Sequence, residues 1–223
     1  VRRTLLTIRA INEAGRAFAI WLSLFGDISH RSEDPKERQH ADDMMGLLTP
    51  VVKGVLTDYG FANAVNAQQM FGGHGYIAEW GMEQFVRDAR IPMIYEGANG
   101  VQAMDLVGRK LPRDGGRAVM AFFGEVQAFV NAHKGDEKMK SYVEPLGVSL
   151  GHLQQATMWF MNNAMKNPDN AGAGANDYMH LFGLVALGLM WGRIVKAANE
   201  KLASGAAGNG GLDAQALKNK LIV

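Results

Sequence analysis

The sequence predicts an all-α protein, an up-and-down helical bundle followed by a second, smaller helical bundle. Apolar residues recur at three- and four-residue steps along most of the chain, which is the spacing of one helical face. No run alternates between apolar and polar residues as a strand would, and no repeat of fixed period is present. With 223 residues and 48% hydrophobic content, the chain can bury one large core or two modest ones.

The first part of the chain predicts two long helices that pack as a hairpin. Polar residues from 27 to 35 interrupt the first apolar stripe. Asp34 and Pro35 are typical of an N-cap and an N1 position, and Glu37 at N3 would complete a capping box. The second stripe continues past Pro50, which predicts a kink rather than a helix end. Representative stripe positions are Leu5, Ile8, Phe18, Leu22 and Phe25, then Met44, Leu47, Val51, Val55 and Tyr59.

A glycine cluster and a shorter helix follow. Gly72-Gly73-His74-Gly75 favours a tight turn, because glycine tolerates positive φ and close approach of other groups to the backbone. Residues 82 to 89 have the spacing of a short amphipathic helix, and helical spacing resumes at Val101. Glu96 is therefore expected between two helices.

A domain boundary is predicted at residues 110 to 116 (KLPRDGG), whose proline, glycines and charges are typical of an exposed connection. The predicted domains are residues 1–110 and 113–223. In the second domain we expect two helices, with stripes that begin at Val119 and Met139.

A third helix of the second domain is expected from Tyr178 to Ala203. Residues 167 to 176 (NPDNAGAGAN) have the composition of a loop, and residues 205 to 211 that of a flexible linker. A short terminal helix is expected near Asp213, which gives about eight helices. Three glycines of the third helix would permit close packing: Gly183, Gly188 and Gly192.

Composition excludes several classes of function. A net charge of +1 predicts neither a nucleic-acid surface nor an anionic-membrane surface. The absence of cysteine excludes disulfides and thiolate chemistry and favours a reducing compartment, so we expect a cytoplasmic location. No metal-ligand spacing is present, so no metal is expected. The longest apolar stretch, residues 181 to 192, is shorter than the roughly 20 residues of a membrane span.

Taken alone, Glu96 has two interpretations. Apolar neighbours on one side disfavour the charged form of a carboxylate and raise its pKa toward values useful for proton transfer. The alternative is an N-cap or first-turn acid for the helix that begins near Asn99, which spacing alone favours. The glycine cluster likewise marks a turn more often than a phosphate site, and His74 is more often a polar loop residue than a ligand or base.

Three ordered motifs change this balance. Residues 69–77 (QMFGGHGYI), 87–90 (RDAR) and 94–97 (IYEG) resemble three consecutive signatures of the acyl-CoA dehydrogenase family, in its order and spacing. Residues 1 to about 110 resemble its carboxyl-terminal helical domain. Residues 100–110, and more loosely 113–223, resemble the branch with an extra carboxyl-terminal helical domain, which includes 3-methylmercaptopropionyl-CoA dehydrogenases.

The resemblance implies an FAD-dependent enzyme that forms a 2,3-enoyl-CoA. Glu96 would be the base that removes the α-proton of the acyl-CoA thioester while a hydride passes from the β-carbon to the flavin. Tyr95 and Gly97 would contribute main chain near the thioester. The Arg87-Asp88-Ala89-Arg90 charges are interpreted as structural.

The cofactor contacts implied by the resemblance come from two segments. Gln69, Gly72 and Gly73 would contact the pyrophosphate or adenosine portion of the FAD of a neighbouring subunit. Ala98 and Gly100 occupy flavin-contacting positions of the family, but Ala98 stands where the family commonly has threonine and lacks its hydroxyl.

The family's amino-terminal helical and middle β-domains are absent from this sequence, and the chain opens with Val1 rather than methionine. We therefore expect a piece of a longer protein that binds little flavin and is inactive alone. Expected partners are an acyl-CoA substrate, an electron-transfer flavoprotein and further copies of the chain in a homodimer or larger oligomer. Alternatives are a helical assembly module, an acyl-CoA oxidase and a DNA-binding flavoprotein relative, against which the near-neutral charge argues.

Overall fold

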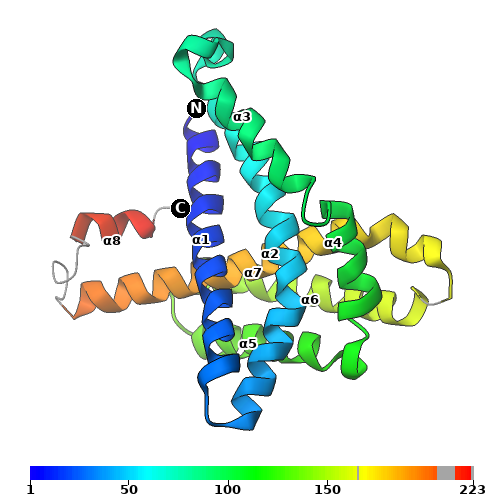
Figure 1. The fold of residues 1–223 in the computed structure, drawn as a ribbon. Helices are drawn as coiled ribbons and strands as arrows, with labels where there is room; N and C mark the ends of the chain where they lie inside the picture. Colours follow the sequence, from blue (N-terminus) through cyan, green and yellow to red (C-terminus); the bar gives the residue numbers. More distant parts are fainter. Residues whose placement is uncertain (165, 205–213, 222–223) are drawn as a thin grey trace.

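The computed structural model describes residues 1–164, 166–204 and 214–221. Within these residues it contains eight α-helices and no strand, which confirms the predicted all-α class. Figure 1 shows two long helices side by side, with a third long helix crossing both. The helices are α1 (Arg2–Arg31), α2 (Pro35–Met70), α3 (Met82–Arg90), α4 (Asn99–Asp105), α5 (Arg117–His133), α6 (Lys140–Asn163), α7 (Pro168–Ala203) and α8 (Ala214–Lys220).

The turn between α1 and α2 differs in detail from the expectation. α1 continues to Arg31 instead of ending near residue 27, because Ile28 still packs against the core. Asp34 caps α2 as predicted, accepting a hydrogen bond from the Lys36 N–H at 2.8 Å. Glu37 does not complete a capping box: it accepts a hydrogen bond from the Ser32 hydroxyl at 2.6 Å, and Ser32 Oγ accepts one from the Asp34 N–H.

α2 continues through Pro50, as the sequence predicted, and Pro50 is buried. The glycine cluster forms a short 3-10 helix, η1 (Gly72–Tyr76), directly after α2. Gly75 is required there by packing, since a Cβ at this position would overlap the carbonyl oxygen of Gln68. The side chain of Gln68 in turn donates to the Gly75 carbonyl at 3.1 Å. The turn is therefore closed against the last turns of α2.

α7 lies at the centre of the molecule and contacts both predicted halves of the chain. One apolar cluster includes buried residues of α1, α2, α4, α5, α6 and α7. Leu111, inside the predicted connection, is buried in this cluster. The division into residues 1–110 and 113–223 stays a prediction, while the apolar core is continuous across it.

The glycines of α7 pack closely, as expected. A Cβ at Gly183 would lie 2.6 Å from both Cγ atoms of Val55 on α2, and one at Gly192 would lie 2.5 Å from the Phe129 ring. At Gly188 the corresponding distance to Leu146 Cδ1 is 3.3 Å. Any larger side chain at the first two positions would force the helices apart.

The expectation of a loop at residues 167–176 is wrong, because α7 already begins at Pro168. Asn167 is the N-cap, accepting from the Asp169 N–H at 3.0 Å, and Pro168 occupies N1. Ala171 and Ala175 are buried, and the space beside Gly174 is filled by the Phe160 ring. The expected linker at 205–211 lies outside the described residues. α8 begins at Ala214, close to the predicted start.

By length and composition, α7 is the one helix in the described part of the chain that could cross a membrane. Of its most apolar window, 56% is buried within the protein. Its apolar residues form the centre of the core, in agreement with the buried helix that the sequence predicted.

Candidate active site

Glu96 lies in the turn between η3 (Ile91–Met93) and α4. Its φ is +56°, and Gly97 follows at +80°. A left-handed conformation in a non-glycine residue costs on the order of 1 kcal/mol, and such residues are often found at functional sites. The N-cap of α4 is Ala98, and no acidic residue lies in the first turn of α4. The helix-capping interpretation of Glu96 is therefore wrong.

The backbone of this turn is fixed by two side chains. Lys53 on α2 donates from Nζ to the Gly97 carbonyl at 2.7 Å. Gln102 on α4 donates from Nε2 to the carbonyls of Glu96 and Gly97, at 3.1 and 3.3 Å. In the described part of the chain, the Glu96 carboxylate itself has no hydrogen bond or ion pair. The turn thus holds the backbone and leaves the carboxylate available.

Asn99 anchors the same turn to the core. It is only 8% exposed and begins α4 three residues after Glu96. Its side-chain oxygen accepts from Lys53 Nζ at 2.7 Å, and its side-chain nitrogen donates to Asp58 Oδ1 at 2.7 Å and to the Gly54 carbonyl at 3.1 Å. Lys53 therefore joins the Gly97 carbonyl to the Asn99 side chain.

The described residues do not provide the apolar enclosure expected around Glu96. Ile94 and Tyr95 are 51% and 52% exposed, and Glu96 and Gly97 are exposed as well. Ile94 and Tyr95, the apolar residues directly before Glu96 in the sequence, are thus half open to solvent in the described structure. Any desolvation of Glu96 must come from groups outside the described residues.

The predicted cofactor-contacting residues fall into two separate places. Gln69 is exposed in the last turn of α2, and Gly72 and Gly73 are exposed at the start of η1. At the usual rise of an α-helix, Gln69 lies about 24 Å along α2 from Lys53. The chain does not bring Gln69, Gly72 and Gly73 to Glu96, whereas Ala98 and Gly100 are within four residues of it.

The residues of both places fit an externally bound group. Gly72 (φ +60°), Gly73 and Gly100 have no neighbouring atom within 4 Å of the position of a Cβ, so their backbone can be approached closely. Gly72 and Gly73 present exposed backbone at a glycine turn, a geometry suited to phosphate oxygens. Ala98 offers a methyl group only and makes no cap hydrogen bond.

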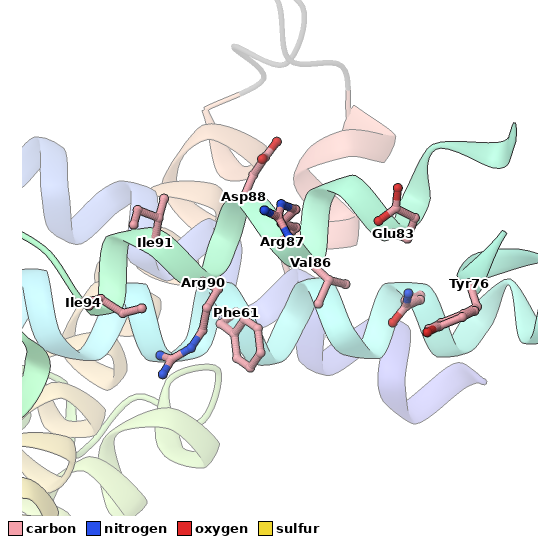
Figure 2. Close-up of a pocket in the computed structure, with 10 residues that line it drawn as sticks. Phe61, Tyr76, Glu83, Val86, Arg87, Asp88, Arg90, Ile91 and Ile94 are labelled. Atoms are coloured by element: carbon pink, nitrogen blue, oxygen red, sulfur yellow. The ribbon is translucent and has the colours of Figure 1, made fainter. Parts of the chain in front are cut away.

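A groove of about 670 Å³ runs between α2 and α3. Figure 2 shows its lining side chains, among them Phe61 on α2 and Arg87, Asp88 and Arg90 on α3. The Arg90 guanidinium lies 5.9 Å from the centre of the Phe61 ring. Asp88 accepts from Gln84 at 2.7 Å. Among the described residues, neither arginine forms the ion pair to the Glu96 turn that a structural role would suggest.

Comparisons with known proteins identify the family. The sequence model described as "Acyl-CoA dehydrogenase, C-terminal domain" matches residues 34–111, and the one described as "Acetyl-CoA dehydrogenase C-terminal like" matches residues 122–222. The chain belongs to the acyl-CoA dehydrogenase family. It comprises the carboxyl-terminal domain of these proteins and the appended carboxyl-terminal-like domain, as the motifs predicted.

Curated acyl-CoA dehydrogenases are similar over most of this chain. A 3-methylmercaptopropionyl-CoA dehydrogenase of Ruegeria pomeroyi is 37% identical over 210 residues, which cover 92% of the chain and 35% of the relative. The broad-specificity linear acyl-CoA dehydrogenase FadE5 of Mycobacterium tuberculosis is 30% identical over 219 residues, which cover 94% of the chain and 35% of that relative. The chain thus spans about a third of the length of these relatives.

A solved structure, Bd2924 apo-form, shares the fold. It superposes with a TM-score of 0.64 at 20% sequence identity, over 85% of this chain and 32% of that one. At this identity the likeness concerns the arrangement of the helices alone.

Several residues around the acyl-CoA dehydrogenase motif were not singled out from the sequence. Lys53, Asp58 and His180 have no motif of their own. Lys53 and Asp58 contact Gly97 and Asn99 from α2, and His180 on α7 contacts Asp58. Asn99 could have been found, since a polar residue at the start of a helix, three residues after a candidate catalytic residue, is placed to hold the turn. Gln102 lies one turn further along the same helix, within reach of the turn's carbonyls.

Proposed function

We propose that this chain is the carboxyl-terminal portion of an FAD-dependent acyl-CoA dehydrogenase and that Glu96 removes the α-proton of an acyl-CoA thioester. The observation that carries the proposal is the Glu96 turn. Its two carbonyls are fixed by Lys53 and Gln102 while the carboxylate is exposed and unpaired within the described residues. A base whose backbone is held in place and whose carboxylate is left free to accept a proton suits this reaction.

The chemistry of the step assigns a separate task to each group. The α-proton passes to a Glu96 carboxylate oxygen, and the Cα–H electron pair becomes the new Cα=Cβ bond as a hydride leaves the β-carbon. FAD, when bound, supplies the hydride acceptor. The Tyr95 N–H already donates to the Ile91 carbonyl at 3.3 Å. The main-chain donor for the thioester oxygen would therefore be an N–H group of the turn between Tyr95 and Gly97.

The cofactor proposal uses the two separate places described above. Ala98 and Gly100 would lie near the flavin that serves Glu96. Gln69, Gly72 and Gly73 would contact the pyrophosphate or adenosine portion of the FAD of a neighbouring subunit. The separation of about 24 Å along α2 supports an assignment of the two places to different portions of cofactor.

Purified alone, the 223-residue chain should contain little tightly bound FAD and should not oxidise acyl-CoA. It spans about a third of its relatives, and in this chain the Glu96 carboxylate is open to solvent. The measurement is the flavin absorbance of the purified protein, with acyl-CoA-dependent reduction of an artificial electron acceptor. A yellow protein with stoichiometric FAD and turnover would contradict this prediction.

Replacing Ala98 by threonine should stabilise the protein by about 1 kcal/mol, because the hydroxyl would cap α4, whose N-cap makes no side-chain hydrogen bond. In the full-length enzyme, the same change should also slow the loss of FAD on dialysis. Ala98→Val, which matches the shape without the hydroxyl, is the control. Equal stability and equal FAD retention in the two variants would contradict the role proposed for position 98.

The electron-transfer flavoprotein, the homo-oligomer and the cytoplasmic location stay predictions. The oxidase alternative differs in the electron acceptor. Oxygen consumption in place of reduction of an electron-transfer flavoprotein by the full-length enzyme would favour it.

A further inference from the structure

The side chain of Asn99 is held in one orientation by its partners. Lys53 is a donor only, so it must face the side-chain oxygen of Asn99. The Asp58 carboxylate and the Gly54 carbonyl are acceptors, so they must face the side-chain nitrogen. Thr57 completes the set at 2.9 Å from this nitrogen. Asp58 is the one charged acceptor among the three that face this nitrogen, so its hydrogen bond is the strongest of them and contributes most to the orientation of the amide.

Asp58 is shared between Asn99 and a residue of α7. Its Oδ1 accepts from Asn99, and its Oδ2 lies 2.8 Å from His180 Nε2. Since a carboxylate accepts only, the imidazole donates this hydrogen bond. The ring of His180 also meets the Tyr59 ring edge-on, with centroids 5.6 Å apart. The two contacts together fix the direction of the imidazole.

The packing of α7 on α2 holds His180 in this place. Directly before His180, Met179 fills the space beside Gly54, where a Cβ would overlap its side chain. One turn later, Gly183 admits the side chain of Val55. α7 therefore touches α2 on both sides of His180, at Gly54 and Val55, which directly follow Lys53 and lie one turn before Asp58.

We infer that His180, in the appended domain, is a positioning residue for Glu96, acting through Asp58 and Asn99. Asp58 aligns the Asn99 amide, which with Lys53 fixes the Gly97 carbonyl and so the direction in which the Glu96 carboxylate points. The inference rests on the proposed function, since it needs Glu96 to be the base. It gives the appended domain a role in the reaction beyond assembly.

The test compares His180→Phe with His180→Gln in the full-length enzyme. Phenylalanine keeps a ring beside Tyr59 but cannot donate to Asp58, whereas the glutamine amide can. His180→Phe should lower kcat roughly tenfold, because small misplacement of a reacting group is costly. KM and FAD content should change little, and α-deuterated acyl-CoA should show a larger isotope effect on flavin reduction. His180→Gln should restore most of the rate and the normal isotope effect.

Two further variants separate positioning from stability. His152→Phe is a matched control on α6. This exposed histidine has no hydrogen bond or ion pair among the described residues, so the kinetics of the variant should equal those of wild type.

Asp58→Ala should lower kcat with the same rise in isotope effect. Adding His180→Phe to it should lower kcat no further, because both act along one chain of contacts. If His180→Phe does not fold, Asp58→Ala alone carries the test.

Unchanged kcat and isotope effect in His180→Phe, or in Asp58→Ala where it replaces that variant, would overturn the inference. So would a loss of FAD or of thermal stability without a change in isotope effect, which is the result of a structural role. The proposed function has a separate test, which is flavin reduction in Glu96→Gln. The result of that test does not depend on the result for His180→Phe.

Discussion

Glu96→Gln in the full-length enzyme should lower kcat for acyl-CoA oxidation by about 10³-fold or more, the upper part of the range for loss of a general base. Glutamine has the shape of glutamate but cannot take the α-proton. FAD content and Tm should stay close to wild type, because in the described part of the chain the carboxylate makes no contact that supports the fold. The measurement is steady-state turnover together with flavin absorbance and a thermal melt.

Glu79→Gln provides a matched control, since Glu79 is another exposed carboxylate between α2 and α3, outside the proposed machinery. It should have the kinetics of wild type. Near-normal flavin reduction in Glu96→Gln would end the assignment of Glu96 as the base, whatever the effect at Glu79.

Truncation of the full-length enzyme after Lys110 should destabilise the part of the protein that carries Glu96. The truncation removes α7, and with it the residues that cover Val55 and Gly54 on α2. Each large apolar side chain exposed costs about 1.5–3 kcal/mol, so several together should lower the Tm by roughly 10 °C or more. Turnover should fall as well, because His180 is lost with α7.

A truncation that removes less of the chain, after Ala203, keeps α7 and removes α8. It also removes the contacts that α8 makes with Arg9 and Glu13 on α1. It should retain the core, the bound FAD and most of the turnover.

Unchanged Tm, oligomer size and kinetics after truncation at Lys110 would contradict the shared core. That outcome would also remove the alternative in which the appended domain is an assembly module.

The helices were predictable because their buried stripes are regular and their starts carry local signals, as at Asp34 and Pro35. The same signal, Asn167 followed by Pro168, was present at the start of α7. The glycines and alanines that follow it have a loop-like composition, although Ala171 and Ala175 are buried and Gly174 lies against Phe160 in the fold. Small residues give no apolar stripe, so their burial is decided by what packs on them.

Glu96 was found by its motif and not by its local chemistry. The apolar residues beside it in the sequence suggested enclosure, yet Ile94 and Tyr95 lie on the surface. The positive φ of Glu96 and Gly97 makes this segment a short turn, whose exposure helical periodicity does not describe.

The contacts that hold Glu96 could not be predicted from the sequence. His180 and Asp58 are 122 residues apart, and they meet because α7 crosses α2 at its glycines. Nothing in the spacing of either helix marks these two polar residues as partners.

Exchange of the α-proton with solvent tests the central claim most directly. An acyl-CoA whose β-carbon carries no hydrogen cannot lose a hydride, so only proton abstraction is measured. Incubated in D₂O, the full-length enzyme with bound FAD should incorporate deuterium at the α-carbon, as read by mass spectrometry, and Glu96→Gln should incorporate none above the rate without enzyme. Deuterium incorporation by Glu96→Gln at the wild-type rate would contradict the account.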